Sequence, residues 1–182
     1  ILFVGSCFAD NIGKRFEEEK FRAMVNPFGV MYNPVSVLHT VRKMASHTFD
    51  TAVFTLGTNH VYVERATGEI VDNCQKRPQR EFKERELTVE ESADALREAI
   101  TLLRQANPKV KVIITISPIR YAKYGYHGSQ LSKAVLLLAA DKLEKEEGET
   151  VYYFPAYEIV NDELRDYRFY KADMLHPNEQ AV

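Results

Sequence analysis

The sequence predicts an α/β domain with three layers, α/β/α, built on a doubly wound and mainly parallel sheet of about five strands. Short apolar runs alternate with segments of helical period, and every strong run is followed by a segment long enough for a right-handed crossover. A chain of 182 residues with 45% hydrophobic content is sufficient for one domain with a full core. We therefore expect a single domain over residues 1–182.

The first half of the chain contains three of the predicted strands, at residues 1–4, 22–25 and 52–56. Residues 9–20 have the period of a helix, and Asn33-Pro34 reads as an N-cap with proline at the first position of a second helix. The connection at residues 49–52 is abrupt for a helix followed by a strand, which suggests that residues are missing there. Runs at 61–63 and 69–71, joined through Thr67-Gly68, predict a hairpin.

The second half repeats the alternation of helices and strands. Thr88 and Glu91 form a capping box that opens a long amphipathic helix, which ends before Asn107-Pro108. The apolar run 111–116 is the best candidate for a central strand. A helix at 129–146, a strand at 150–154 and a short helix at 158–164 complete the predicted elements.

Composition and charge exclude several classes of protein. The net charge is -2 and the basic residues are scattered among acids, so nothing indicates nucleic acid binding. Apolar runs such as 134–140 are far shorter than the roughly 20 residues of a membrane span. The chain opens inside an apolar strand without an initiator Met, which suggests trimmed ends and leaves a signal peptide open.

Two cysteines, Cys7 and Cys74, are too few for a disulfide framework or a zinc cluster. We expect both to be free thiols, because one belongs to a strand-end turn and the other to the loop after the hairpin. Their number slightly favours a reducing compartment such as the cytoplasm. We expect neither a metal nor a cofactor.

Polar residues follow several of the predicted strands. Gly5-Ser6, Gly57-Thr58-Asn59, Ser117-Pro118-Ile119-Arg120 and the segment from Asp173 to His176 all come after strands, and ligands of open α/β sheets bind outside the carboxyl ends of strands. A serine becomes nucleophilic when a histidine accepts its proton and a carboxylate orients that histidine. This pattern predicts a triad of Ser6, His176 and Asp173. The start of the helix after Ser6, with Gly29 and Asn59, could stabilise an oxyanion.

The sequence resembles the GSCFA family, a branch of the SGNH (GDSL-like) hydrolases. The similarity runs over nearly the whole chain and is carried by Gly5-Ser6-Cys7-Phe8-Ala9, Asn26-Pro27-Phe28-Gly29, Tyr32-Asn33-Pro34, Thr55-Leu56-Gly57-Thr58, Asn73-Cys74-Gln75-Lys76, Ser117-Pro118, Ser132-Lys133, Tyr153 to Glu158 and Asp173 to Asn178. The resemblance implies an SGNH-like or flavodoxin-like sheet and the Ser6–His176–Asp173 triad. It also implies an oxyanion hole made by the N–H groups of Ser6 and Gly29 and an Asn side chain. The third SGNH motif, usually Gly-x-Asn-Asp, is here Gly57-Thr58-Asn59-His60.

Each of these residues also has a plain structural interpretation. Ser6 could be only a helix N-cap, the segment from Asp173 to His176 a turn, and Gly29 a position of positive φ. Asn59 and Asn73 could serve loop backbone, and Arg120 could pair with a surface acid. Arg120, Asn73 and His60 are our candidates for contact with a substrate.

The predicted function is hydrolysis or transfer of an acyl group through a Ser6 acyl-enzyme. By analogy alone, the expected substrate is a small-molecule or glycan ester, such as an acetyl group on a carbohydrate. The alternative is a binding or scaffold domain that kept this fold without the chemistry. An acyltransferase differs from a hydrolase only in whether water or another hydroxyl resolves the acyl-enzyme.

Overall fold

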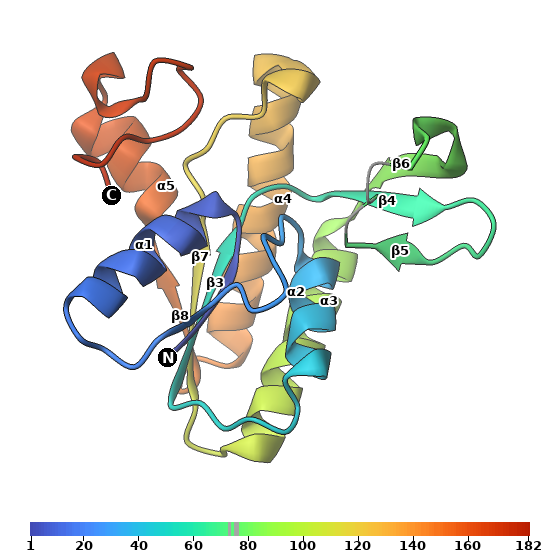
Figure 1. The fold of residues 1–182 in the computed structure, drawn as a ribbon, viewed down its shortest axis with the longest axis vertical. Coiled ribbons are helices and arrows are strands. Elements are labelled where there is room, and N and C mark those ends of the chain that lie inside the picture. Colours follow the sequence, from blue (N-terminus) through green and yellow to red (C-terminus); the bar gives the residue numbers. More distant parts are fainter. Residues whose placement is uncertain (73, 75–76) are drawn as a thin grey trace.

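A computed structural model describes residues 1–72, 74 and 77–182, and shows a five-stranded parallel sheet (Figure 1). The strands lie in the order β2 (Met24–Val25), β1 (Leu2–Gly5), β3 (Thr51–Leu56), β7 (Lys111–Ile116) and β8 (Val151–Phe154). Every pair in this sheet is parallel. The predicted doubly wound parallel sheet is thus confirmed.

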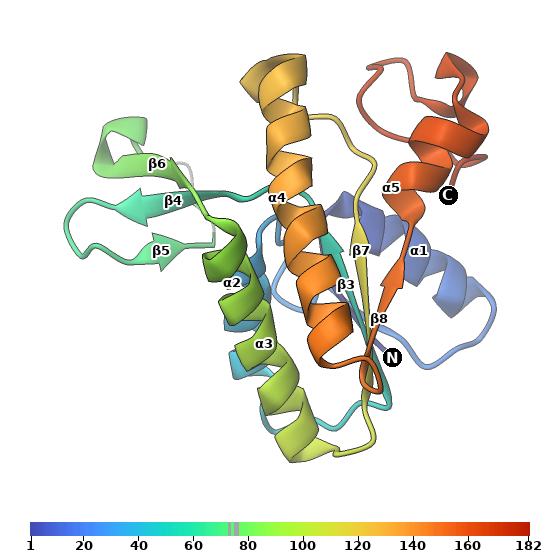
Figure 2. The same cartoon turned by 180° about the vertical axis from the view of Figure 1, so that it is seen from behind.

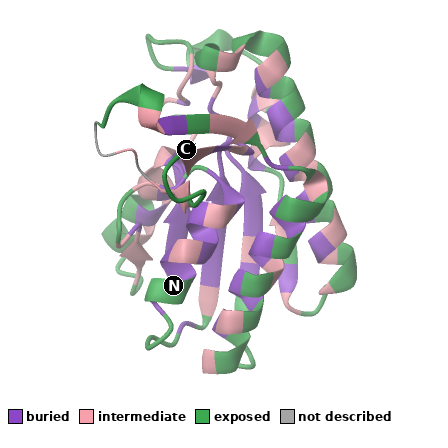
Figure 3. Ribbon diagram, turned by 90° about the vertical axis from the view of Figure 1, so that its right-hand side faces the viewer, coloured by how far each residue is buried: buried purple, intermediate pink, exposed green. Residues whose placement is uncertain are grey.

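Helices cover both faces of the sheet, as Figures 1 and 2 show from opposite sides. The main core contains the buried faces of α2 (Pro34–Lys43), α3 (Val89–Ala106) and α4 (Gly125–Glu146). On the opposite face lie α1 (Cys7–Glu18) and α5 (Ala156–Glu158), which continues as a π-helical stretch over Ile159–Leu164. The strands between these layers are mostly buried (Figure 3).

Local sequence signals explain where the helices begin. The Thr88 hydroxyl accepts a hydrogen bond from the Glu91 N–H at 3.1 Å, and the Glu91 carboxylate accepts one from the Thr88 N–H at 2.8 Å. The Asn33 side chain accepts from the Ser36 N–H at 3.0 Å. Such caps satisfy N–H groups that have no partner inside the helix. Both predicted starts are confirmed, whereas α4 begins four positions before the predicted Ser129, at Gly125, after the 3₁₀ turn Ala122–Tyr124.

A second, three-stranded antiparallel sheet projects beside α2 and α3 (Figure 1). Its order is β5 (Ile70–Val71), β4 (His60–Glu64) and β6 (Phe82–Glu86), with the 3₁₀ turn Gln79–Glu81 before β6. Only β4 and β5 were expected as a hairpin. The strand β6 escapes sequence reasoning because four of its five residues are charged and only Phe82 is buried.

Two further expectations concern the chain as a whole. Both Cys7 and Cys74 are free, as predicted. Among the described residues, no helix is both long and apolar enough to cross a membrane.

Candidate active site

Asp173 and His176 form a close pair in the loop that follows the 3₁₀ turn Tyr167–Phe169. The Asp173 carboxylate lies 2.6 Å from His176 Nδ1 and accepts the backbone N–H groups of Leu175 and His176 at 2.9 and 3.0 Å. These two backbone N–H groups, that of His176 first, together with the imidazole, lower the pKa of the Asp173 carboxyl to about 2. The carboxylate therefore stays ionised and fixes the orientation of the imidazole, and both side chains remain solvent-accessible.

Ser6 occupies the turn between β1 and α1. It is the N-cap of α1, its Oγ accepts the Phe8 N–H at 3.3 Å, and Thr55 Oγ1 lies 3.3 Å from the same atom. Ser6 is completely buried. The serine hydroxyl is thus held against β3 in a capping role.

The structure brings Asp173 and His176 together but does not join Ser6 to them by a hydrogen bond. The histidine loop is nevertheless tied to the carboxyl edge of the sheet. The Arg120 N–H, just after β7, donates to the Leu175 carbonyl at 3.0 Å, and the Lys171 N–H donates to the His176 carbonyl at 2.8 Å. Burial raises the pKa of the Cys7 thiol, which lies next to Ser6 in the chain. The positive charge of Lys171 acts on the same thiol in the opposite direction.

The three expected oxyanion donors make other hydrogen bonds. The Ser6 N–H donates to the Thr55 carbonyl at 3.0 Å, and the Gly29 N–H donates to the Asn26 carbonyl at 2.8 Å. The Asn59 side chain is completely buried and donates to the Leu87 carbonyl at 2.8 Å, at the start of α3. Gly29 has a φ of +90°, a conformation that favours glycine, so a turn requirement alone accounts for it.

Asn26 is a positioning residue that sequence reasoning missed. Its Oδ1 accepts the Gly5 N–H at 2.9 Å, and its Nδ2 donates to the Asp10 carboxylate at 2.6 Å. The side chain therefore links the end of β1 to the first turn of α1. It holds the segment that carries Ser6 in place from both sides.

Tyr121 and Lys133 are two further residues at the same sheet edge. A Cβ at Gly57, directly after β3, would lie only 2.2 Å from the Tyr121 hydroxyl, so a larger residue there would force the Tyr121 ring to shift. The Tyr121 hydroxyl is buried and has no hydrogen-bond partner among the described residues. The Lys133 ammonium, also buried, donates to the carbonyls of Gly57 and Ser117, each at 2.6 Å. In the sequence, only the Ser132-Lys133 motif of the family resemblance indicated that Lys133 has a role at this edge.

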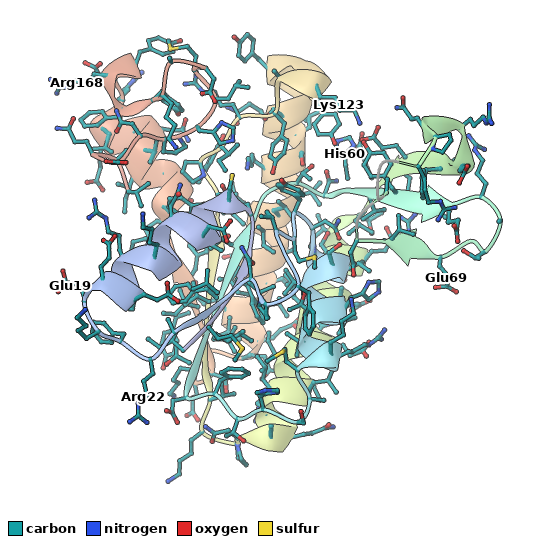
Figure 4. The ribbon with its side chains drawn as sticks, in the orientation of Figure 1. Glu19, Arg22, His60, Glu69, Lys123 and Arg168 are labelled. Atoms are coloured by element: carbon teal, nitrogen blue, oxygen red, sulfur yellow. The ribbon has the colours of Figure 1, made fainter. Side chains whose placement is uncertain are left out.

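Of the three residues expected to contact a substrate, the two that the structure describes do not lie together. Arg120 lies at the sheet edge, with its guanidinium 4.1 Å from the Tyr170 ring centroid. His60 stacks on Tyr124 at 3.6 Å between ring centroids, next to Glu84, and burial lowers its pKa. Figure 4 shows His60 near Lys123, where the second sheet meets the start of α4. Asn73 lies outside the described residues.

The sequence matches the GSCFA family in two segments, residues 1–51 and 42–182, which together span the whole chain. The chain belongs to the GSCFA family. Residues Gly5 to Ala9, whose one-letter codes spell GSCFA, form the turn from the end of β1 into the first residues of α1. Comparison of this GSCFA chain with curated proteins finds no match.

Solved structures share the fold of this GSCFA protein at low sequence identity. One is described as a platelet activating factor from Streptococcus pneumoniae (TM-score 0.61, 14% identity, covering 99% of this chain and 78% of that one). A carbohydrate esterase of family 3 from Talaromyces cellulolyticus gives 0.55, with 11% identity and coverage of 99% and 88%. A GDSL-like lipase from Bacteroides ovatus gives 0.57, with 12% identity and coverage of 99% and 48%.

No group of three or more His, Cys, Asp or Glu side chains in the described part of the chain is arranged to hold a metal ion. The chemistry that this site offers is that of an oriented imidazole, a strand-end serine and the N-terminus of α1.

Proposed function

We propose that this GSCFA protein is an SGNH-type serine esterase in which Ser6 is the nucleophile, His176 the general base and Asp173 the residue that orients it. The observation that carries the proposal is the Asp173–His176 contact of 2.6 Å. With Nδ1 held by an ionised carboxylate, Nε2 is the ring nitrogen left to accept a proton. The loop that holds this pair is bonded to Arg120, at the sheet edge where β1 delivers Ser6.

The reaction requires Ser6 to exchange its partners. In the proposed first step, Oγ leaves Thr55 and the Phe8 N–H and turns toward His176 Nε2, which takes its proton as Oγ attacks the ester carbonyl carbon. The protonated imidazole then gives that proton to the departing alcohol, leaving an acyl group on Ser6. Water repeats the sequence, releasing the acid and restoring the serine.

The developing oxyanion needs donors other than those first expected, because Gly29 and Asn59 donate to carbonyls elsewhere. The N-terminus of α1 carries a partial positive charge directly at Ser6. The buried Tyr121 hydroxyl supplies a donor without a partner in the described chain. Within this proposal, these two groups replace the expected Gly29 and Asn59.

The proposed substrate is a small acyl ester, such as an acetyl group on a carbohydrate. Support comes from the shared fold of an acetyl esterase and of a carbohydrate esterase, which is an argument by analogy. Whether water or a second sugar hydroxyl resolves the acyl-enzyme distinguishes hydrolysis from transfer. Product analysis with and without an added sugar acceptor separates the two.

A second candidate, a GSCFA domain that binds carbohydrate without cleaving it, is favoured by one observation. Ser6 is fully buried and hydrogen-bonded as a helix cap, with no bond to His176. A domain that had lost the chemistry would keep such a serine for the stability of α1.

A fluorophosphonate probe distinguishes the two candidates. The esterase should acquire one covalent label, which peptide mapping places on Ser6, and should release acid from p-nitrophenyl acetate or acetylated sugars. Absence of both labelling and hydrolysis in protein with an intact thermal transition would support the binding domain. Labelling that persists in Ser6→Ala would place the reactive group elsewhere.

A further inference from the structure

A pocket of about 260 Å³ lies between the loop after β7, α4 and the segment that follows α5. Its volume falls just below the roughly 300–1,000 Å³ of typical small-molecule sites, so it suits a group of about one ring. It is lined by the aromatic rings of Tyr121, Tyr126, Tyr157 and Tyr167. The other polar side chains of its wall include two cations, Arg120 and Lys133, and no carboxylate.

Lys133 is the buried polar group of this pocket. Only 2% of the residue is exposed, and two of its three ammonium N–H groups donate to the carbonyls of Gly57 and Ser117. The ammonium lies 5.1 Å from the Tyr121 ring centroid and 5.9 Å from that of Tyr157. It forms no ion pair within the described chain, so its charge is balanced only by carbonyl dipoles and ring faces. A buried cation in this situation is stabilised by an incoming anion.

Arg120 adds a second positive charge to the wall of the pocket. Its guanidinium lies 5.3 Å from the Tyr167 ring centroid and 4.1 Å from that of Tyr170, and it too has no carboxylate partner among the described residues. Tyr126 and Tyr167, which also line the pocket, are 79% and 63% exposed, so both side chains are accessible to a ligand. A guanidinium can bind a carboxylate or a phosphate through two parallel N–H groups.

We propose that this pocket binds an anionic sugar, a single pyranose ring that carries a carboxylate or a phosphate. The tyrosine faces would take the flat side of the ring. Arg120 would pair with its negative group, and the Lys133 ammonium would supply long-range attraction and its remaining N–H.

The position of the pocket links it to the proposed esterase site. Tyr121 packs in one apolar cluster with Phe8 and Cys7, directly after Ser6, and the Arg120 N–H holds the Leu175 carbonyl next to His176. The substrate class therefore rests on the proposed function: the esterase would act on an ester of a negatively charged sugar. Binding of the sugar itself does not depend on catalysis.

The test is a binding titration of the unmodified protein, followed by NMR or calorimetry, with glucuronate, glucose 6-phosphate and neutral glucose. At least one anionic sugar should bind about tenfold or more tightly than glucose, and its affinity should fall as salt rises. Glucuronate as the tighter ligand identifies a carboxylate and glucose 6-phosphate a phosphate. Equal binding of glucose and both anions, or binding of none, overturns the proposal.

Variants localise the binding. Arg120→Gln should weaken binding of the preferred anion about tenfold. Arg168→Gln, which alters an exposed arginine of the C-terminal segment outside the pocket (Figure 4), should change that affinity less than twofold. Equal effects of the two variants would overturn the assignment to this pocket. Anion binding by a protein that fails to react with fluorophosphonate would refute the esterase and leave the anion site standing.

Discussion

The two halves of the candidate site are built by different means. The Asp173–His176 half is exposed, local in sequence and already hydrogen-bonded for its proposed role. The Ser6 half is buried, and its hydroxyl is bonded to Thr55, 49 positions away in the chain. The proposed acid–base pair is therefore preorganised, whereas Ser6 must give up structural hydrogen bonds before it can act as the proposed nucleophile.

The largest effect is expected from Ser6→Ala, which removes the proposed nucleophile. Activity on p-nitrophenyl acetate should fall roughly 10⁴-fold or more, because the attacking atom is lost. The loss of the N-cap should cost about 1 kcal/mol of unfolding free energy, a Tm decrease of about 2–4 °C. Wild-type activity in Ser6→Ala, measured beside an unchanged circular dichroism spectrum, would rule out Ser6 as nucleophile.

The next effect concerns the preorganised half. Asp173→Asn removes the ionised partner of His176 Nδ1 and should lower kcat by roughly 10²–10⁴-fold, less than Ser6→Ala. Because the Asp173 pKa is lowered to about 2, its carboxylate stays charged in any ordinary assay, and Asp173 should contribute no acid limb above pH 4. Its stabilising effect is present above its unfolded pKa near 3.9 and is lost as the pH falls toward 2. A pH–rate profile of both proteins checks this, and a wild-type acid limb near pH 4–5 that disappears in Asp173→Asn would contradict it.

A smaller effect tests whether the Thr55 bond restrains the nucleophile. Thr55→Val removes one partner of Ser6 Oγ, and a net hydrogen bond of about 0.5–1.5 kcal/mol converts to a roughly 2- to 10-fold faster reaction of Ser6 with fluorophosphonate. Thr115→Val is the matched control, since Thr115 pairs with Thr55 in the neighbouring strand and donates to the Phe154 carbonyl instead. Equal labelling rates in Thr55→Val and Thr115→Val would show that the bond imposes no restraint.

The last effect is on stability instead of activity and concerns Lys133, whose ammonium donates to the Gly57 and Ser117 carbonyls. Burial lowers its pKa to about 7, whereas an unfolded lysine keeps its proton to about pH 10. The unfolded state therefore binds more protons between these values, and this lysine makes stability rise with pH by up to about 1.4 kcal/mol per unit. In urea unfolding between pH 7 and 9.5, wild type should gain stability relative to Lys133→Met. Parallel curves would show that the ammonium is not destabilised by burial.

The same contrast explains what the sequence could predict. Asp173 and His176 were paired correctly because three residues of a single turn separate them, and the caps at Asn33 and Thr88 are equally local. The parallel sheet followed from apolar runs separated by crossover-length helices. The Asp173–His176 pair and the caps depend on contacts within one segment, and the sheet was predictable because the alternation of apolar runs and helical periods can be followed along the chain.

The remaining features depend on contacts between distant segments. Four contacts form only when strands and helices assemble. They are the Ser6–Thr55 contact, the Asn26 link from β1 to α1, the packing of Tyr121 over Gly57 and the hydrogen bond from Lys133 to the Gly57 carbonyl. Asn59 is at the position in the sequence that the third SGNH motif predicts, but its side chain donates a hydrogen bond to the Leu87 carbonyl. Strand β6 was missed because its charged residues lack the apolar pattern of a strand.

The most direct test of the account is a crystal structure of the protein after reaction with a fluorophosphonate. We expect one adduct on Ser6, with Oγ turned away from Thr55 Oγ1 and lying within about 3.5 Å of His176 Nε2, while Asp173 still contacts Nδ1. An adduct on Cys7, or a Ser6 adduct with the His176 ring directed elsewhere, would contradict the proposed triad.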